Sequence, residues 1–261
     1  MRRVEPKVFM IGETQVNLSS FVSYLRHIGV NAAGEWPGSE ELSSLSSAEL
    51  LSEFYGRLCY KSFKENLNPN VTKVRKGNEV YLKHILDVKH LSVLEHCQMN
   101  WVVADLSRVA THEIVRHRVG IAFSQESLRY VRLTDLGLWL PAEAEADPNL
   151  VKMFEEKFAA DEAWQKKISD YLEMDNGKDF EYKKRMTSLM RRGAPIGLAT
   201  TIGMSMNHRQ LRHMITLRTS AAAEAEVRLI FGKMIEICKI KYPNIYQDIE
   251  KNEKGEWVVN G

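Results

Sequence analysis

Two strand-like runs constrain the fold of this chain most strongly. Residues 97–104 alternate, with Met99, Trp101 and Val103 on one side, which is the period of a strand with one buried face. Residues 198–205 include several β-branched side chains and predict a second strand. The chain is therefore expected to combine a small sheet with helices.

Helical spacing accounts for most of the remaining sequence. Ser46 and Glu49 form a capping box ahead of apolar residues at helical spacing. Ser107 can cap a helix that ends near Arg118, with Gly120 as its stop. The other expected helices cover residues 21–28, 78–89, 148–174, 180–192, 207–217 and 220–241, with a short N-terminal strand, a strand at 130–133 and a loop at 34–38. These patterns predict one α+β domain over residues 1–261, with a central, mostly antiparallel sheet flanked by helices.

Composition limits the classes of function. The chain has 261 residues, of which 44% are hydrophobic and 27% charged, and this is typical of a globular protein. A formal net charge of +2 does not give the basic character of a nucleic-acid binder. Three well-separated cysteines form neither a disulfide framework nor a CxxC metal site, and they indicate a reducing cytoplasm. No run is long and apolar enough for a membrane span or a signal peptide.

Charge is distributed unevenly along the chain. No acidic residue lies between Glu181 and Glu224, and this interval is expected to favour an anion. Two interpretations stay open, a solvated basic face and a site that binds phosphate or carboxylate. The basic residues of the interval are Lys183, Lys184, Arg185, Arg191, Arg192, Arg209, Arg212 and Arg218.

Several common catalytic motifs are absent. Residues 112–117, HEIVRH, differ from the zinc-protease motif HExxH because Arg116 stands at the second histidine position, and a guanidinium does not bind zinc. The chain has no GxSxG elbow, no GxxxxGK[ST] loop and no GxGxxG fingerprint. We therefore expect no metal site, and any phosphate would be held by arginines. On a helix, His112 would share a stripe with Arg116, and Glu113 with His117.

Residues 116–130, RHRVGIAFSQESLRY, concentrate hydrogen-bond donors among apolar residues. A solvated charged face would not need the apolar residues between them. A core segment would not tolerate the charge unless an anion met it. The segment is therefore a candidate anion-binding site.

Taken together, these residues resemble the flavin-dependent thymidylate synthases. That family carries RHR, then seven residues, then S-x-R-Y, and this chain has RHR at 116–118 and SLRY at 127–130. Residues 90–96, HLSVLEH, are similar to the family's H-x-[ST]-P-x-E-H segment, and residues 57–60, RLCY, to part of its A-R-x-[CS]-[YF] segment. Arg191 ahead of Pro195, residues 207–209 and residues 217–218 match a third block, so four blocks occur in order.

The chain departs from the family pattern at several positions. Eight residues rather than seven separate Arg118 from Ser127, and Val93 replaces the proline. Glu113 stands where family members often have glutamine, with His112 before it. A carboxylate close to an anionic nucleotide requires a donor partner.

The resemblance implies a reaction and a set of ligands. Family members transfer the one-carbon unit of methylenetetrahydrofolate to C5 of dUMP, with hydride from FAD that NADPH has reduced. They form homotetramers with active sites shared between subunits. Residues implied to bind FAD are Cys59, Ser92, Arg116, His117, Arg118, Gln125, Asn207, Arg209 and His213. Residues implied to bind dUMP are His112, Glu113, Gln125, Glu126, Ser127, Leu128, Arg129, Arg191 and Arg218.

Three of these positions are implied to be catalytic. Arg218 would stabilise negative charge on the uracil, Ser127 would orient the nucleotide, and His90 would lie near the flavin and the folate.

An alternative hypothesis keeps the fold and the flavin and changes the substrate to UMP or another pyrimidine nucleotide. A third hypothesis, from another class, is a non-catalytic binder of single-stranded nucleic acid.

Overall fold

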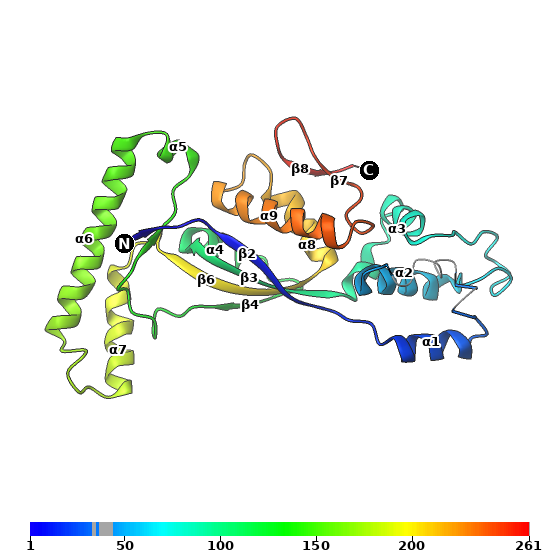
Figure 1. Ribbon diagram of the computed structural model, residues 1–261, viewed down its shortest axis with the longest axis horizontal. Coiled ribbons are helices and arrows are strands. Elements are labelled where there is room, and N and C mark those ends of the chain that lie inside the picture. The colour runs from blue at the N-terminus through cyan, green and yellow to red at the C-terminus, as the bar shows by residue number, and fades with distance from the viewer. Residues whose placement is uncertain (33–34, 37–43, 261) are drawn as a thin grey trace.

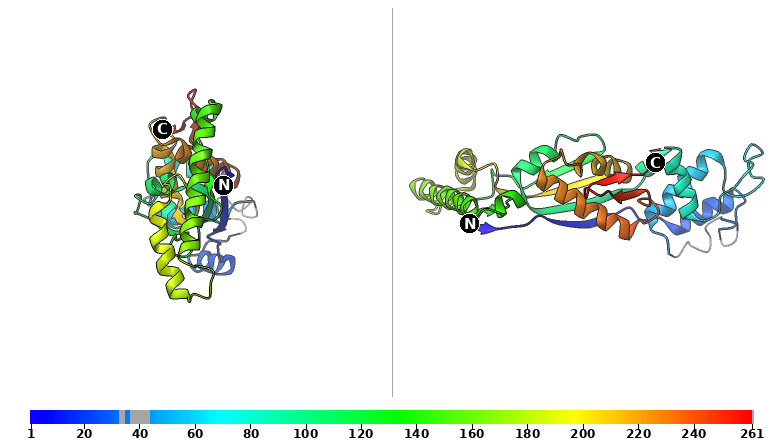
Figure 2. Two further views of the ribbon diagram at one scale, coloured as in Figure 1. Left: turned by 90° about the vertical axis from the view of Figure 1, so that its left-hand side faces the viewer. Right: turned by 90° about the horizontal axis from the view of Figure 1, so that it is seen from above.

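The computed structural model describes residues 1–32, 35–36 and 44–260. The molecule is elongated, with a central sheet between helices α6 and α7 at one end and helices α1, α2 and α3 at the other (Figures 1 and 2). The loop predicted at residues 34–38 lies mostly outside the described residues.

The helices are α1 Leu18–His27, α2 Ser47–Tyr60, α3 Asn78–Asp87, η2 Leu91–Glu95, α4 Arg108–Ile114, α5 Ala142–Glu145, α6 Pro148–Tyr171, α7 Phe180–Met190, η3 Arg191–Gly193, α8 His208–Arg218 and α9 Ala225–Lys241. The strands are β1 Arg2–Arg3, β2 Lys7–Glu13, β3 Gln98–Ser107, β4 Ile121–Gln125, β5 Gly137–Leu138, β6 Ala199–Asn207, β7 Ile249–Lys251 and β8 Trp257–Val259.

The central sheet has the strand order β2-β3-β6-β4, and each neighbouring pair is antiparallel. In its middle, Trp101 of β3 lies opposite Met204 of β6, and both are buried in the main core with apolar residues of α8 and α9. Figure 1 shows α8 and α9 along one side of this sheet. The predicted α+β fold with an antiparallel sheet flanked by helices is confirmed. On β2, the alternate residues Phe9 and Ile11 are 48% and 68% exposed.

Helices α4 and α8 each begin where a central strand ends, and each has a side-chain cap, the predicted one at Ser107 and one at Asn207 that was not predicted. The side chains of Ser107 and Asn207 each accept the backbone N–H three residues later, at 3.1 and 2.8 Å. The predicted capping box of α2 is also present, because Ser46 N donates to Glu49 and Glu49 N donates to Ser46. These caps satisfy N–H groups that the first helical turn leaves unpaired.

Two predictions around the central motif are wrong. Helix α4 ends at Ile114 rather than near Arg118, because the chain turns there and passes through Gly120, whose φ is +71°, into β4. Residues 130–133 do not form a strand, because the N–H groups of Tyr130 and Val131 both bond to the carbonyl of Ser127 and close a turn. The strand of this region is β4, which pairs with β6 inside the RHR-to-serine motif.

The other differences concern elements with weaker signals. The short helix η2 and the β7–β8 hairpin were not predicted, and α9 begins at Ala225 behind the cap residue Glu224 rather than at residue 220. Helices α6 and α7 lie within a few residues of their predicted ranges. In the described part of the chain, no helix combines the length and the apolar character needed to cross a bilayer.

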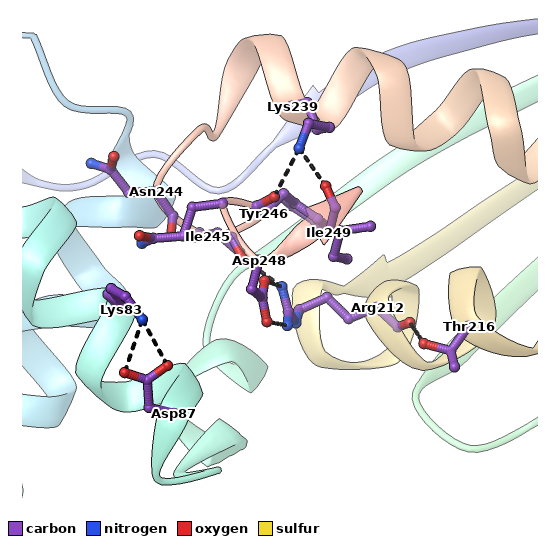
Figure 3. Close-up of polar contacts among 11 residues, drawn as sticks. Lys83, Asp87, Arg212, Thr216, Lys239, Asn244, Ile245, Tyr246, Asp248 and Ile249 are labelled. Carbon is purple, nitrogen blue, oxygen red and sulfur yellow. Dashed lines mark hydrogen bonds and ion pairs between the residues drawn. The ribbon is translucent and has the colours of Figure 1, made fainter. Parts of the chain in front are cut away.

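Arg212 attaches the C-terminal segment to α8. Its Nη1 and Nη2 donate to Oδ1 and Oδ2 of Asp248 at 2.7 and 2.5 Å, and Nη1 also donates to the carbonyl of Ile245 at 2.6 Å (Figure 3). The Arg212 side chain is only 6% exposed. This member of the acid-free interval therefore meets a carboxylate of its own chain.

Candidate active site

Arg218, in the last turn of α8, lies at the centre of the first group of site residues. Its Nε donates to Nε2 of His117 at 2.8 Å, and its Nη1 donates to Oε2 of Glu113 at 3.2 Å. The side chain of Arg218 is 19% exposed, and that of Glu113 is 38% exposed. Arg218 thus meets residues of α4 and of the motif turn that lie more than 100 positions before it in the sequence.

His117 can accept these hydrogen bonds only as a neutral imidazole, with its proton on Nδ1. Burial lowers the pKa of His117, and the positive charge of Arg218 lowers it further. The geometry and the electrostatics therefore agree on an unprotonated His117. Because α4 ends at Ile114, Glu113 and His117 do not share a helical stripe as predicted. They meet through Arg218, while His112 is exposed.

A second group of residues forms an open pocket beside the start of α4, called the Arg108 pocket below. Its lining includes the motif residues Gln125, Glu126, Ser127 and Leu128 together with Arg108, Arg191 and Arg192.

Arg108 contributes positive charge and a free hydrogen-bond donor to this second pocket. Its Nη2 donates to the carbonyl of Glu126 at 2.7 Å, whereas its buried Nε has no partner among the described residues. Burial lowers the pKa of Arg108; the charge of Glu126 opposes this effect, and the nearby Arg191 adds to it. Two guanidinium groups and an unsatisfied donor favour a phosphate or carboxylate here. Arg108 was not predicted as a site residue, although its place directly after the Ser107 cap was a usable signal.

Glu126 lines the same pocket but turns its carboxylate toward the sheet. Its Oε2 accepts the backbone N–H of Thr201 at 3.2 Å and the hydroxyl of Thr200 at 3.4 Å. Gln125 donates through Nε2 to the hydroxyl of Thr111 at 3.2 Å. These contacts hold the loop of Ser127 against β6 and α4.

A third group surrounds a pocket of about 770 Å³ at the start of α8, called the α8 pocket below. Asn207, Arg209 and His213, which the sequence resemblance assigns to FAD, all line it, as do Val119 and Gly120 of the motif turn. Arg209 forms an ion pair with Glu95 of η2. The remaining lining residues are Leu91, Gln210, Arg212, Thr216 and Val259.

His90 lies on the α2 side of η2. Its Nδ1 is 3.0 Å from the hydroxyl of Tyr60, and the two rings stack with centroids 6.1 Å apart. His90, Cys59 and Ser92 are all exposed. Tyr60 orients the His90 ring and was not predicted as part of the site.

Strand β4 explains why the motif alternates polar and apolar residues. Along this strand the chain covers about 17 Å from Gly120 to Gln125. Gly120 lines the pocket at the start of α8, and Gln125 lines the pocket that contains Arg108. Ile121 and Phe123 pack against the main core, and Ala122 and Ser124 are exposed on the other face. The arginines of RHR and those of the Arg108 pocket are therefore at opposite ends of one strand.

Four arginines of the site have no partner for their guanidinium groups among the residues that the structure describes. Arg116 and Arg118 flank His117, Arg129 follows Ser127, and Arg191 lines the Arg108 pocket. All four are exposed. Such a set of unpaired guanidinium groups suits ligands with several phosphates.

Comparison with known proteins gives the family. The family model described as "Thymidylate synthase complementing protein" matches residues 41–244. The flavin-dependent thymidylate synthase of Mycolicibacterium gilvum is 32% identical over 82% of this chain and 84% of that protein. The enzyme of the same name from Corynebacterium diphtheriae is 32% identical over 80% and 81%. The chain belongs to the flavin-dependent thymidylate synthase family.

Solved structures share the fold of this family member. Thymidylate synthase X from Helicobacter pylori, in a structure with FAD and dUMP, has a TM-score of 0.53 and 21% identity over 77% of this chain and 93% of that one. The UMP/dUMP methylase PolB from Streptomyces cacaoi, bound with 5-Br UMP, has a TM-score of 0.61 and 13% identity over 94% of each chain.

The donor set of this synthase-family chain fits a flavin dinucleotide. The α8 pocket combines the amide of Asn207, the imidazole of His213 and the guanidinium of Arg209 with apolar residues. Arg116 and Arg118 lie on the adjoining turn with unpaired guanidinium groups. Cationic donors suit the diphosphate of such a cofactor, and apolar residues suit its ring.

Proposed function

We propose that this chain converts dUMP to dTMP, with methylenetetrahydrofolate as carbon donor and FAD, reduced by NADPH, as hydride source. Family membership supports the reaction class. The observation that carries the proposal is the position of Arg218, a partly buried cation held by His117 and Glu113 close to the other arginines of the motif.

The bound flavin would supply the redox chemistry, and the protein would supply position and charge. We assign FAD to Arg116, His117, Arg118, Asn207, Arg209 and His213, with Gln125, Cys59 and Ser92 at further contacts. His90 would lie near the flavin and the folate. The exposure of Cys59 and His90 and the stacking of His90 on Tyr60 are compatible with a planar ligand at this surface.

We assign the nucleotide phosphate to Arg191, Arg129 and Arg108, because the last of these carries an unsatisfied buried Nε. Ser127 would orient the nucleotide, and Gln125, Glu126 and Leu128 would shape the loop beside it. Arg218 would donate to the uracil ring and stabilise negative charge that develops on it. The neutral His117 would hold Arg218 in place without competing for its charge.

We further propose a cytoplasmic homotetramer with active sites shared between subunits. In one chain, β4 separates the RHR arginines from the Arg108 pocket by about 17 Å. The face of β2 that carries Phe9 and Ile11 is exposed, as expected of a surface that a second copy covers.

The proposal is tested by a product assay. The protein is incubated with FAD, NADPH and methylenetetrahydrofolate, dUMP and UMP are offered together, and nucleotide masses are read. We expect dTMP as the product and a loss of at least about 100-fold in its rate for Arg218→Ala. Full activity in Arg218→Ala would contradict the role assigned to Arg218.

A second candidate substrate is UMP. The extra motif residue and the carboxylate of Glu113 both favour it, because they change the surroundings of the nucleotide relative to the family pattern. Methylated UMP as the main product in the same assay would establish it. A preference for dUMP would rule it out.

A further inference from the structure

Helix α8, whose last residue is Arg218, ends without a glycine cap. Many helices end on a glycine with positive φ, which lets the chain turn back and bond to the last carbonyl groups. Here the residue after Arg218 is Thr219, with a φ of −104°, and the next glycine in the sequence is Gly232. A helix end that lacks this closure frays unless other groups hold it.

The β7–β8 hairpin supplies groups that hold this end. Thr219 is 5% exposed, and its hydroxyl accepts the backbone N–H of Trp257 at 3.2 Å. The same hydroxyl donates to the carbonyl four residues earlier in α8 at 2.9 Å. The backbone N–H of Ala221 donates to Oε1 of Glu256 at 2.6 Å. Two adjacent residues of the hairpin thus hold the chain immediately after Arg218.

The hairpin is closed by its own turn and fixed to the core. Asn252 N donates to the carbonyl of Glu256 at 2.9 Å, and its Nδ2 donates to Oε2 of Glu256 at 2.9 Å. The Trp257 ring packs against the main core, and Nζ of Lys251 lies 4.8 Å from the ring centroid. The hairpin can therefore transmit the position of the core to the end of α8.

We propose that the β7–β8 hairpin is a positioning element for Arg218, with Thr219 and Glu256 as its positioning residues. The hairpin lies beyond residues 41–244, which the family model matches. Neither positioning residue belongs to the set that the family motifs assign to FAD or dUMP. The inference rests on the proposed function, because it takes Arg218 to act on the nucleotide.

The contacts of Arg218 make its position sensitive to the last turn of α8. Its Nε and Nη1 donate to two different elements, the motif turn through His117 at 2.8 Å and α4 through Glu113 at 3.2 Å. A shift of the α8 backbone by about 1 Å would lengthen such bonds beyond good hydrogen-bond geometry, and a misplacement of this size can lower a rate by about 100-fold. The hairpin therefore acts on the reaction through Arg218.

The first test uses two variants that each remove one contact of the hairpin. Thr219→Val keeps the shape of the side chain and removes its hydroxyl, and Glu256→Ala removes the acceptor for Ala221. Thr219→Ser keeps the hydroxyl. The matched control is Thr14→Val, because the hydroxyl of Thr14 likewise accepts a backbone N–H, that of Gln98 at 2.9 Å, between the edge strand β2 and β3.

We expect Thr219→Val and Glu256→Ala to lower kcat for dTMP formation by about tenfold or more. The KM for dUMP should stay within about threefold of the wild-type value, because the Arg108 pocket is unchanged. Thr219→Ser and Thr14→Val should keep the wild-type kcat. Val259 of the same hairpin lines the α8 pocket, so flavin absorbance is measured to show that each variant is folded and loaded.

A second readout reports the position of Arg218 without turnover. Burial lowers the pKa of His117, and the charge of Arg218 lowers it further. The pKa of His117 is followed by NMR of histidine-labelled protein, in which His117→Gln identifies the resonance. Thr219→Val should raise this pKa toward its value in Arg218→Ala, whereas Thr14→Val should leave it unchanged.

The outcomes separate this inference from the proposed function. If the wild type makes dTMP and Thr219→Val keeps both the kcat and the pKa of His117, the hairpin does not position Arg218. A loss of activity that follows loss of flavin, with an unchanged pKa of His117, also overturns the inference. If the wild type forms no dTMP and Thr219→Val raises the pKa of His117, the proposed function is wrong and the positioning of Arg218 stands. Glu256→Ala carries the same tests if Thr219→Val does not fold.

Discussion

The histidine at the start of α8 makes stability depend on pH. His208 is 1% exposed, and its Nδ1 lies 3.0 Å from the hydroxyl of Tyr246. Its ring packs edge-on against Tyr242 with centroids 4.6 Å apart. Burial lowers the pKa of His208 to about 3, although the charge of Glu13 opposes this effect. Because α8 carries Arg209, His213 and Arg218, the state of His208 also affects the site.

The size of the effect follows from linkage between protonation and folding. A folded state with a lowered histidine pKa is fully stable above the unfolded value, about 6.5, and loses stability as the pH falls below it. At pH 5 the unfolded chain has taken up this proton, whereas His208 in the folded protein has not. Lowering the pH from 7 to 5 should therefore cost about 2 kcal/mol of unfolding free energy through this residue alone.

The assay is urea unfolding at pH 7 and pH 5 for the wild type and for His208→Gln, which cannot titrate. We expect the wild type to lose about 2 kcal/mol more than the variant between the two pH values. Tyr246→Phe keeps the histidine buried and removes only its hydrogen bond, so it should retain the wild-type pH dependence. An equal loss in wild type and His208→Gln would refute the reasoning.

Three further predictions concern the substrate, the C-terminal anchor and a helix cap. Arg191→Ala should raise KM for dUMP by about tenfold or more without changing FAD content, because it removes one hydrogen-bond donor to the nucleotide phosphate. An unchanged KM would exclude this role for Arg191. Asp248→Asn should lower the unfolding free energy by about 3 kcal/mol, because it leaves the buried Arg212 without its charged partner. Denaturant titration measures this loss, and a loss below about 1 kcal/mol would contradict the prediction. Ser46→Ala should cost about 1 kcal/mol in the same titration, whereas Ser46→Thr should cost less.

Much of the fold could be predicted because its signals are local. The caps at Ser46 and Ser107 act on N–H groups three residues away, so the sequence reveals them directly. The alternation of β3 is visible because every second residue faces one core. The family motifs likewise lie in short segments, so the sequence alone indicates the flavin-dependent thymidylate synthases.

Strand β4 could not be predicted from its local sequence. Its five residues give only a short alternation, and they form a strand because β6 offers an edge to pair with. The run at 130–133 looked more like a strand but closes a turn on the carbonyl of Ser127. Short strands depend on their partners more than on their own residues.

The sequence by itself determined the caps of α2 and α4, the apolar face of β3 and which arginines are candidates for anion binding. Only the tertiary structure decided how those arginines are used. Arg212 meets Asp248 of its own chain, whereas Arg218 meets Glu113 and His117 and keeps donors for a ligand. The physical reason is range: a cap or an alternating face is set by neighbours within a few residues, whereas the partner of a charge depends on which distant elements pack beside it.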